Sequence, residues 1–145
     1  MNYRQIVEGA LDTFGRIVML ALVVWREARG QAFACKLAVA YVAVTRAEDP
    51  RKNWWGDDML AVLFTPMQFS SVTDKHDAQL VLWPRENASW TECLRAAAAA
   101  YFHWEKNPAP GATHYHSFKV QDPPAAWGKA DFIVKVDDIY FFKAA

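Results

Sequence analysis

Apolar positions at helical spacing dominate the first third of the chain. Residues 3–14 place apolar side chains three and four positions apart and predict a short helix that Gly15 closes. Residues 16–28 are apolar on almost every side, which is typical of a helix at the centre of a core. Residues 32–47, with Ala and Val at close-packing positions, predict a third helix. The N-terminal part of the chain therefore predicts a helical body.

Two further helices are predicted after the loop that follows. Asp57 or Asp58 is expected to cap a short helix. Residues 89–105 predict a long helix with Ser89 as its N-cap, the first residue of a capping box. The run Ala96–Ala100 indicates a close contact with another helix, or simply reflects the high helix propensity of alanine.

The pattern changes near the C-terminus. Residues 113–118 alternate between polar and apolar side chains, as a strand does. Residues 132–142 predict a hairpin that turns at Asp137 and Asp138. The sequence therefore predicts one α+β domain over residues 1–145, with a mostly helical body and a small antiparallel sheet near the C-terminus.

Composition and charge exclude several classes of protein. Hydrophobic residues make up 53% of the chain and aromatic residues 14%, which is the composition of a folded domain. Lys and Arg total 16 and so do Asp and Glu, so nucleic acid is not an expected partner. The uncharged run Ile17–Trp25 is shorter than the roughly 20 residues of a membrane span, so no stable membrane insertion is expected. Cys35 and Cys93 lie in apolar helical stretches and are predicted to be buried thiols.

Glu27 is the residue that fits this pattern least. On a helix it shares a face with Val23 and Val24, so its carboxyl group is directed towards the core. It also lies in the last turn, near the negative end of the helix dipole. Burial and the dipole both raise the pKa of the carboxyl, as a general acid requires. The flanking Arg26 and Arg29 leave a second interpretation, in which one of them folds back and makes Glu27 an ordinary ion-pair partner.

Four segments of the chain resemble the SleB-type cell wall hydrolase family, which contains the cortex-lytic enzymes of spore germination and relatives that include phage lysins. Residues 25–30 (WREARG) and the Ala/Val helix after them resemble the opening of the family's domain. Residues 68–70 (QFS) resemble its Gln-Phe-Ser segment. Residues 107–116 (NPAPGATHYH) resemble its Pro-rich turn and following strand, and residues 139–142 (IYFF) resemble its final strand. The matched segments follow one another in the family's order.

The resemblance implies a compact, lysozyme-related α+β catalytic region over residues 16–142, preceded by an N-terminal helix in residues 1–15. It implies an enzyme that cuts peptidoglycan between N-acetylmuramic acid and N-acetylglucosamine. The chemistry implied is that of a lytic transglycosylase, which leaves 1,6-anhydro-N-acetylmuramic acid ends. The family's one catalytic glutamate matches Glu27, and no cofactor is implied. The chain departs from the family at Thr45, where Asn is usual, which bears on sugar specificity.

Four side chains are candidates for sugar binding: Gln68, Ser70, Tyr115 and His116. Gln and Ser offer hydrogen bonds to N-acetyl and hydroxyl groups, and Tyr offers a flat apolar face. The alternatives are a loop cap for Ser70 and a half-buried strand position for Tyr115. His114 and His116 would share one face of a strand and could bind zinc, but no third ligand accompanies them, so no metal site is predicted.

Other functions are also consistent with the sequence: a muramidase that uses water, a non-catalytic peptidoglycan-binding module, or a zinc amidase or peptidase. The muramidase would normally need a second carboxylate. The candidates are Asp57, Asp58, Asp74, Asp77 and Glu86. None of them lies in a second catalytic motif, which favours a mechanism with one carboxylate.

The expected partner is the glycan strand of peptidoglycan, bound by a monomer. The sequence shows neither a signal peptide nor a transmembrane segment. This pattern predicts a phage endolysin that waits in the host cytoplasm and reaches the periplasm and cell wall after holin-type release. A bacterial enzyme released on lysis would look the same.

Overall fold

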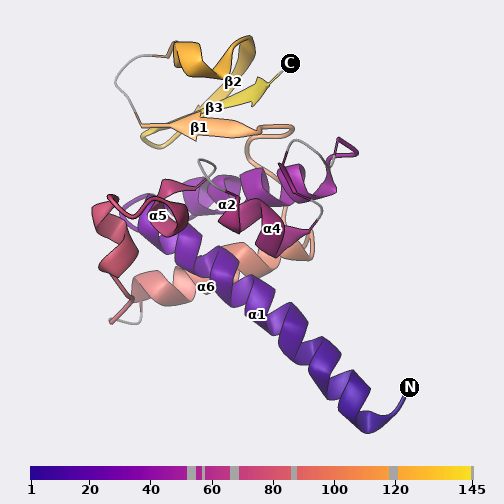
Figure 1. The fold of residues 1–145 in the computed structure, drawn as a ribbon. Coiled ribbons are helices and arrows are strands. Elements are labelled where there is room, and N and C mark those ends of the chain that lie inside the picture. Colours follow the sequence, from indigo (N-terminus) through magenta and orange to yellow (C-terminus); the bar gives the residue numbers. More distant parts are fainter. Residues whose placement is uncertain (52–54, 57, 66–68, 86–87, 118–120, 145) are drawn as a thin grey trace.

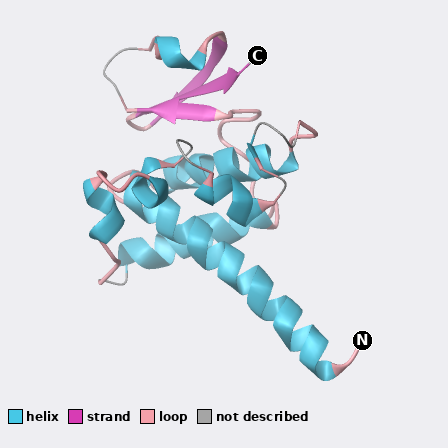
Figure 2. Ribbon diagram, in the orientation of Figure 1, coloured by secondary structure: helices cyan, strands magenta, loops and turns pink. Residues whose placement is uncertain are grey.

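A helical body and a small antiparallel sheet form the two layers of the molecule (Figure 1). The computed structural model describes the whole chain except residues 52–54, 57, 66–68, 86–87, 118–120 and 145, and it describes Ser70 by its backbone alone. Figure 2 shows the strands gathered on one side of the helices. The predicted α+β class is therefore confirmed.

The bounds of the elements are as follows. The helices are α1 (Tyr3–Ala28), α2 (Phe33–Glu48), α4 (Met59–Phe64), α5 (Ser70–Thr73), η1 (Ala78–Val81, 3-10), α6 (Ala88–Tyr101) and η2 (Ala125–Trp127, 3-10). The strands are β1 (His114–His116), β2 (Ala130–Val136) and β3 (Ile139–Ala144).

The core lies where α1, α2 and α6 pack against one another. The C-terminal half of α1 is buried on nearly every side, as its all-round apolar pattern predicts. Four of the five residues in Ala96–Ala100 are buried, so α6 approaches both neighbouring helices closely and the predicted helix contact is confirmed. Cys35 and Cys93 are buried in this core, as predicted, and burial raises the pKa of the Cys35 thiol to about 12.

One continuous helix stands where the sequence predicted two. α1 runs through Gly15, so the prediction that Gly15 closes a first helix is wrong. A glycine costs a helix about 1 kcal/mol, but it ends the helix only where it adopts a left-handed backbone, which Gly15 does not. Because the helix does not stop, its N-terminal half extends away from the body (Figure 1).

Of the two helix N-caps predicted from the sequence, one is confirmed and one is wrong. Asp58 caps α4, and its side chain accepts a hydrogen bond from the Ala61 N–H at 2.9 Å. Asp57 lies outside the described residues. α6 begins one residue before Ser89, so Ser89 lies in the first turn and is not the N-cap. Its hydroxyl is 3.4 Å from the carbonyl oxygen of Arg29, the residue that follows α1.

The C-terminal end of α6 is earlier than predicted. The sequence favoured a helix to residue 105, but α6 ends at Tyr101. His103 adopts a left-handed backbone with φ 55, and the N–H of Trp104 reaches back to the Ala99 carbonyl at 2.8 Å. This is the hydrogen-bond pattern of a Schellman end, formed here by a histidine in place of the usual glycine.

The sheet has the strand order β1-β3-β2, with both pairs antiparallel. The predicted hairpin is confirmed, since β2 and β3 are joined by a turn at Asp137 and Asp138, with Asp137 at φ 51. This turn contacts the loop between α1 and α2: the Ala32 N–H donates to Asp137 Oδ2 at 2.7 Å, and the Asp138 N–H donates to Gln31 Oε1 at 3.2 Å. The sheet is thereby fastened next to the C-terminal end of α1. Within the described residues, no helix is both long and apolar enough to cross a membrane.

Candidate active site

Glu27 lies in the last turn of α1, and its side chain is half-buried. Burial raises the pKa of its carboxyl, because a low-dielectric environment disfavours the anion. The Ser71 hydroxyl and N–H and the Tyr115 hydroxyl act in the opposite direction, and the negative charge of Asp77 raises the pKa further. The net direction is upward. A raised pKa for Glu27 is what its position on the core face of the helix predicts.

Three elements bring polar groups to this carboxyl. Ser71 comes from α5 and Tyr115 from β1. Asp77 is the N-cap of η1, and its side chain accepts a hydrogen bond from the Gln79 N–H at 2.8 Å. Ser71 is buried, and its hydroxyl and its N–H are both donors to the Glu27 carboxyl. The Tyr115 hydroxyl is a third donor, from the opposite side of the site.

The arginines that flank Glu27 are bound to other groups. The Arg26 guanidinium is buried and donates to the carbonyl oxygens of Ser71 at 2.9 Å, Leu80 at 3.0 Å and Leu82 at 3.0 Å. Arg29 donates to the side chain of Gln79 at 2.7 Å. Neither arginine forms an ion pair with Glu27 in the described structure. The ion-pair interpretation of Glu27 is therefore wrong, because both guanidinium groups hold the α5–η1 segment.

A second buried arginine positions β1. Arg46 of α2 donates from Nε to the Thr113 carbonyl at 2.8 Å, and its guanidinium lies over the rings of Trp55 and Phe69 at 5.0 and 4.9 Å. Burial lowers its pKa to about 10, which leaves it charged at neutral pH. The hydrogen bond fixes the start of β1 on α2, and Tyr115 follows two residues later. Trp55 is itself buried in the core.

The structure brings some of the predicted sugar-binding residues to Glu27 and not others. Tyr115 lies next to the carboxyl, and burial together with the charge of Glu27 raises the pKa of its hydroxyl well above the usual value. Gln68 lies outside the described residues, and Ser70 is the first residue of α5, with no description of its side chain. Sequence reasoning did not identify Ser71, because nothing in the sequence distinguishes it from its neighbour Ser70. It named Asp77 only as one of five carboxylates.

His116 lies on the other face of β1 from Tyr115, since side chains alternate along a strand. His116 and His114 both contact Trp127, at 5.7 and 4.7 Å between ring centroids. The Nε2 of His116 is 3.0 Å from the Asp122 carbonyl oxygen. Burial, with a smaller contribution from Arg46, lowers the pKa of His114 to about 4, so its ring is neutral at pH 7. No three His, Cys, Asp or Glu side chains gather as a metal site among the residues that the structure describes.

A groove of about 460 Å³ opens beside the start of β1. Thr113 contributes to its lining and lies on the same face of the strand as Tyr115. Thr45, the position where the chain departs from the SleB-type pattern, lines the groove as well. Charged residues of both signs line it too: Glu48, Asp49, Arg51 and Lys143.

The first prediction concerns the stability of Glu27→Gln. The folded protein holds the Glu27 proton more tightly than the unfolded chain, whose pKa is near the ordinary 4.5, so the wild type loses stability as the pH rises above about 4.5. Glutamine does not titrate. We expect the variant to be more stable than the wild type at pH 7 and the difference to disappear below about pH 4, as measured by urea unfolding across pH 4 to 8. A variant that is less stable than the wild type at pH 7 would show that the folded protein stabilises the charged form.

The chain is similar to two curated relatives. It is 28% identical over 113 residues to the spore cortex-lytic enzyme of Bacillus subtilis (strain 168), a match that covers 78% of this chain and 33% of the relative. It is 31% identical over 99 residues to the spore cortex-lytic enzyme of Halalkalibacterium halodurans, covering 68% of this chain and 26% of the relative. The chain thus spans a third or less of the length of these relatives.

Solved structures and a family profile extend the comparison. The catalytic domain of the germination-specific lytic transglycosylase SleB from Bacillus anthracis superposes with a TM-score of 0.67 at 26% identity, covering 88% of this chain and 93% of that domain. The catalytic domain of the Bacillus cereus SleB protein gives a TM-score of 0.67 at 25% identity, covering 88% and 89%. These matches support the predicted lysozyme-like fold. Residues 30–142 match the profile of the cell wall hydrolase family. With that match over most of its length and with the fold of the SleB catalytic domains, the chain belongs to the cell wall hydrolase family.

Proposed function

We propose that this chain cleaves peptidoglycan glycan strands between N-acetylmuramic acid and N-acetylglucosamine as a lytic transglycosylase, with Glu27 as both acid and base. The observation that carries the proposal is a half-buried carboxyl with a raised pKa, whose two neighbouring arginines are bound to other groups. Such a group keeps its proton to higher pH than an ordinary surface carboxylate does, as a general acid requires. The likeness to a solved domain named as a lytic transglycosylase supports the same chemistry.

The reaction would proceed in two steps at Glu27. The protonated carboxyl donates its proton to the glycosidic oxygen, the bond from that oxygen to C1 of N-acetylmuramic acid breaks, and an oxocarbenium-like sugar forms. The resulting carboxylate then takes the proton of the C6 hydroxyl on the same sugar, and the C6 oxygen bonds to C1. The products are a strand with a new N-acetylglucosamine hydroxyl and a 1,6-anhydro-N-acetylmuramic acid end. Glu27 regains its proton, and no water is consumed.

Asp77 is the carboxylate that a water-using muramidase would recruit, because its charge acts on Glu27. Its Oδ1 already accepts the hydrogen bond that caps η1, and this structural use argues against a nucleophile or a base at that position. We assign it an electrostatic role instead: its negative charge disfavours the Glu27 anion and keeps the acid protonated to higher pH.

Tyr115 and Ser71 are the groups that would hold the sugar at Glu27. The Tyr115 ring offers an apolar face and its hydroxyl a hydrogen bond, and the buried Ser71 hydroxyl lies beside the Glu27 carboxyl. Roles for Gln68 and Ser70 stay predictions from the sequence. For His116 we propose an indirect role, since it packs with Trp127 on the other face of the strand that carries Tyr115. The phage endolysin setting and the holin-type release also stay predictions.

The second prediction tests the reaction type through its products. Purified peptidoglycan is digested in water enriched in oxygen-18, and the muramyl ends are identified by mass spectrometry. A transglycosylase leaves anhydro ends that carry no label, because the C6 oxygen of the sugar itself closes the bond. Reducing N-acetylmuramic acid ends that carry the heavy isotope would contradict the proposal and identify a muramidase.

The third prediction separates the two roles of Asp77. The activity of an enzyme that needs protonated Glu27 falls as the pH rises through the Glu27 pKa. Asp77→Asn removes a charge that raises this pKa, so the alkaline limb of the kcat/KM profile should move to lower pH while activity at acidic pH is retained. Asparagine can still cap η1 through its side-chain oxygen.

The matched control is Asp74→Asn, an exposed position three residues earlier whose side chain accepts a hydrogen bond from the His76 N–H at 2.8 Å. This variant should leave the alkaline limb of the kcat/KM profile at the same pH as in the wild type. Loss of activity at every pH in a folded Asp77→Asn protein would instead identify Asp77 as a second catalytic carboxylate.

A further inference from the structure

The N-terminal half of α1 carries a stripe of exposed apolar side chains. Tyr3 is 82% exposed, Leu11 62% and Phe14 64%, although each is of a type that folded proteins normally bury. These residues follow the same helical period as the buried face of the C-terminal half, so one apolar face runs along the whole helix and only its second half is covered in the described structure. The stripe consists of Tyr3, Ile6, Val7, Ala10, Leu11 and Phe14.

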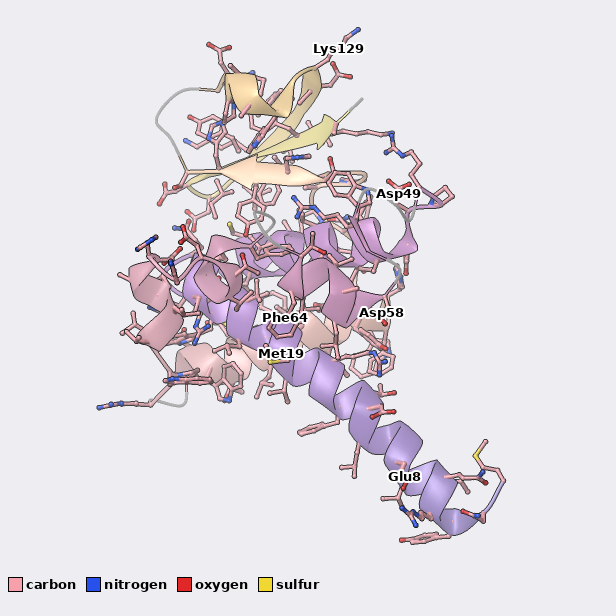
Figure 3. All side chains as sticks on the ribbon, viewed as in Figure 1. Glu8, Met19, Asp49, Asp58, Phe64 and Lys129 are labelled. Atoms are coloured by element: carbon pink, nitrogen blue, oxygen red, sulfur yellow. The ribbon has the colours of Figure 1, made fainter. Side chains whose placement is uncertain are left out.

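Capping and a side-chain ion pair stabilise this part of the helix. Asn2 and Gln5 form a reciprocal capping box, with the Gln5 N–H donating to Asn2 at 3.0 Å and the Asn2 N–H donating to Gln5 at 2.8 Å. On the polar face, Arg4 pairs with Glu8 at 2.7 Å over one helical turn. Figure 3 shows Glu8 on the protruding half and Met19 where the helix reaches the body. The apolar face of this capped, amphipathic helix is uncovered in the described structure.

The spacing of the stripe points to the identity of that partner. We propose that the N-terminal half of α1 pairs with the same segment of a second copy, antiparallel about a two-fold axis between residues 8 and 9. The apolar positions read the same in both directions from that point, so Tyr3 lies opposite Phe14 of the other copy. By the same symmetry Ile6 faces Leu11, and Val7 faces Ala10. A two-fold interface must match itself in this way, because each copy offers the same surface.

Area and geometry agree with this pairing. The two large aromatic side chains and three branched aliphatic ones are exposed in the single chain. Pairing would bury on the order of several hundred Å² per copy, against the roughly 800 Å² per partner of a standard interface. The segment extends away from the body in Figure 1, so the two bodies would lie at opposite ends of the paired helices. The paired segment precedes residue 30, where the family match begins, and the inference is independent of the proposed reaction.

Charge argues against a membrane surface as the partner. The polar face carries the exposed Arg4, Glu8 and Asp12 and the half-buried Arg16, so its basic and acidic residues balance. Helices that lie on anionic membranes have an excess of Lys and Arg on this face. A second copy needs no such excess. The sequence alone led us to expect a monomer, and the exposed stripe, which appears only because α1 continues through Gly15, changes that expectation.

The test is the mass of the full chain in solution, measured by light scattering and sedimentation over a range of concentrations. We expect a species of twice the 16.5 kDa chain mass. Leu11→Glu places a carboxylate on the stripe in both copies and should weaken self-association by about 100-fold or more. Gln5→Glu adds the same charge on the polar face, where it preserves the capping box, and should leave the dimer intact. Both positions are exposed, so both variants should fold, as circular dichroism will verify.

Three outcomes would overturn the pairing. The first is a wild type that stays monomeric at all concentrations. The second is a dimer that Leu11→Glu and Gln5→Glu affect equally, which would place the interface elsewhere. The third is a monomer that co-floats with phosphatidylglycerol vesicles and loses this binding in Leu11→Glu, which would identify a lipid surface as the partner. None of these results bears on whether Glu27 cuts peptidoglycan, so the two proposals fail separately.

Discussion

The guanidinium of Arg26 donates to three backbone carbonyls, and the site depends on this arrangement. Ser71, Leu80 and Leu82 supply those carbonyls, so the α5–η1 segment is fastened across the C-terminal turn of α1. The same bonds keep Arg26 from neutralising Glu27, which lies one residue further along the helix. Arg29 also donates to this segment, through the side chain of Gln79, and so is likewise kept from pairing with Glu27. An arginine paired with Glu27 would lower the pKa of its carboxyl. Here the two guanidinium groups instead hold the α5–η1 segment, which helps to bury the carboxyl, and burial raises the pKa.

The opposite wall depends on Arg46 in a similar way. Its hydrogen bond to the Thr113 carbonyl joins α2 to β1, and the contacts of Asp137 and Asp138 with the α1–α2 loop hold the other end of the sheet. These two attachments hold the sheet so that Tyr115 of β1 lies next to the Glu27 carboxyl. In this structure buried or half-buried arginines serve the backbone, while the acid is surrounded by hydroxyl groups and a second carboxylate. That distribution of charge raises the Glu27 pKa, which is the direction that a proton donor requires.

The parts of this site that could be predicted from the sequence are those set by residues close together in the chain. The helical period of α1 directs Glu27 towards the core, so its burial and the direction of its pKa shift could be derived from neighbours three and four positions away. Alternation along β1 is equally local, and it separates Tyr115 from His116 once one of them is placed. Ser71 and Asp77 come from short elements with no period of their own, and they meet Glu27 only through the bonds of Arg26 and Arg29 to distant residues.

Two errors in the fold have local physical causes that a pattern does not reveal. Gly15 has the residue type of a helix end, yet the helix continues because the backbone there stays right-handed. His103 has the residue type of a helix interior, yet it adopts the left-handed conformation that ends α6. In both cases the conformation of one residue decided the element's length, and residue type predicted the opposite.

The central claim is that Glu27 is the acid and base of a peptidoglycan-cleaving enzyme. The most direct measurement compares the release of soluble fragments from purified peptidoglycan by the wild type, Glu27→Gln and Glu8→Gln. The last variant changes an exposed glutamate in the same helix. The account predicts that Glu8→Gln matches the wild type and that folded Glu27→Gln is slower by at least about 100-fold, the range that a positioned acid–base group contributes. A folded Glu27→Gln protein that digests peptidoglycan as fast as the wild type would contradict the account and place the catalytic group elsewhere.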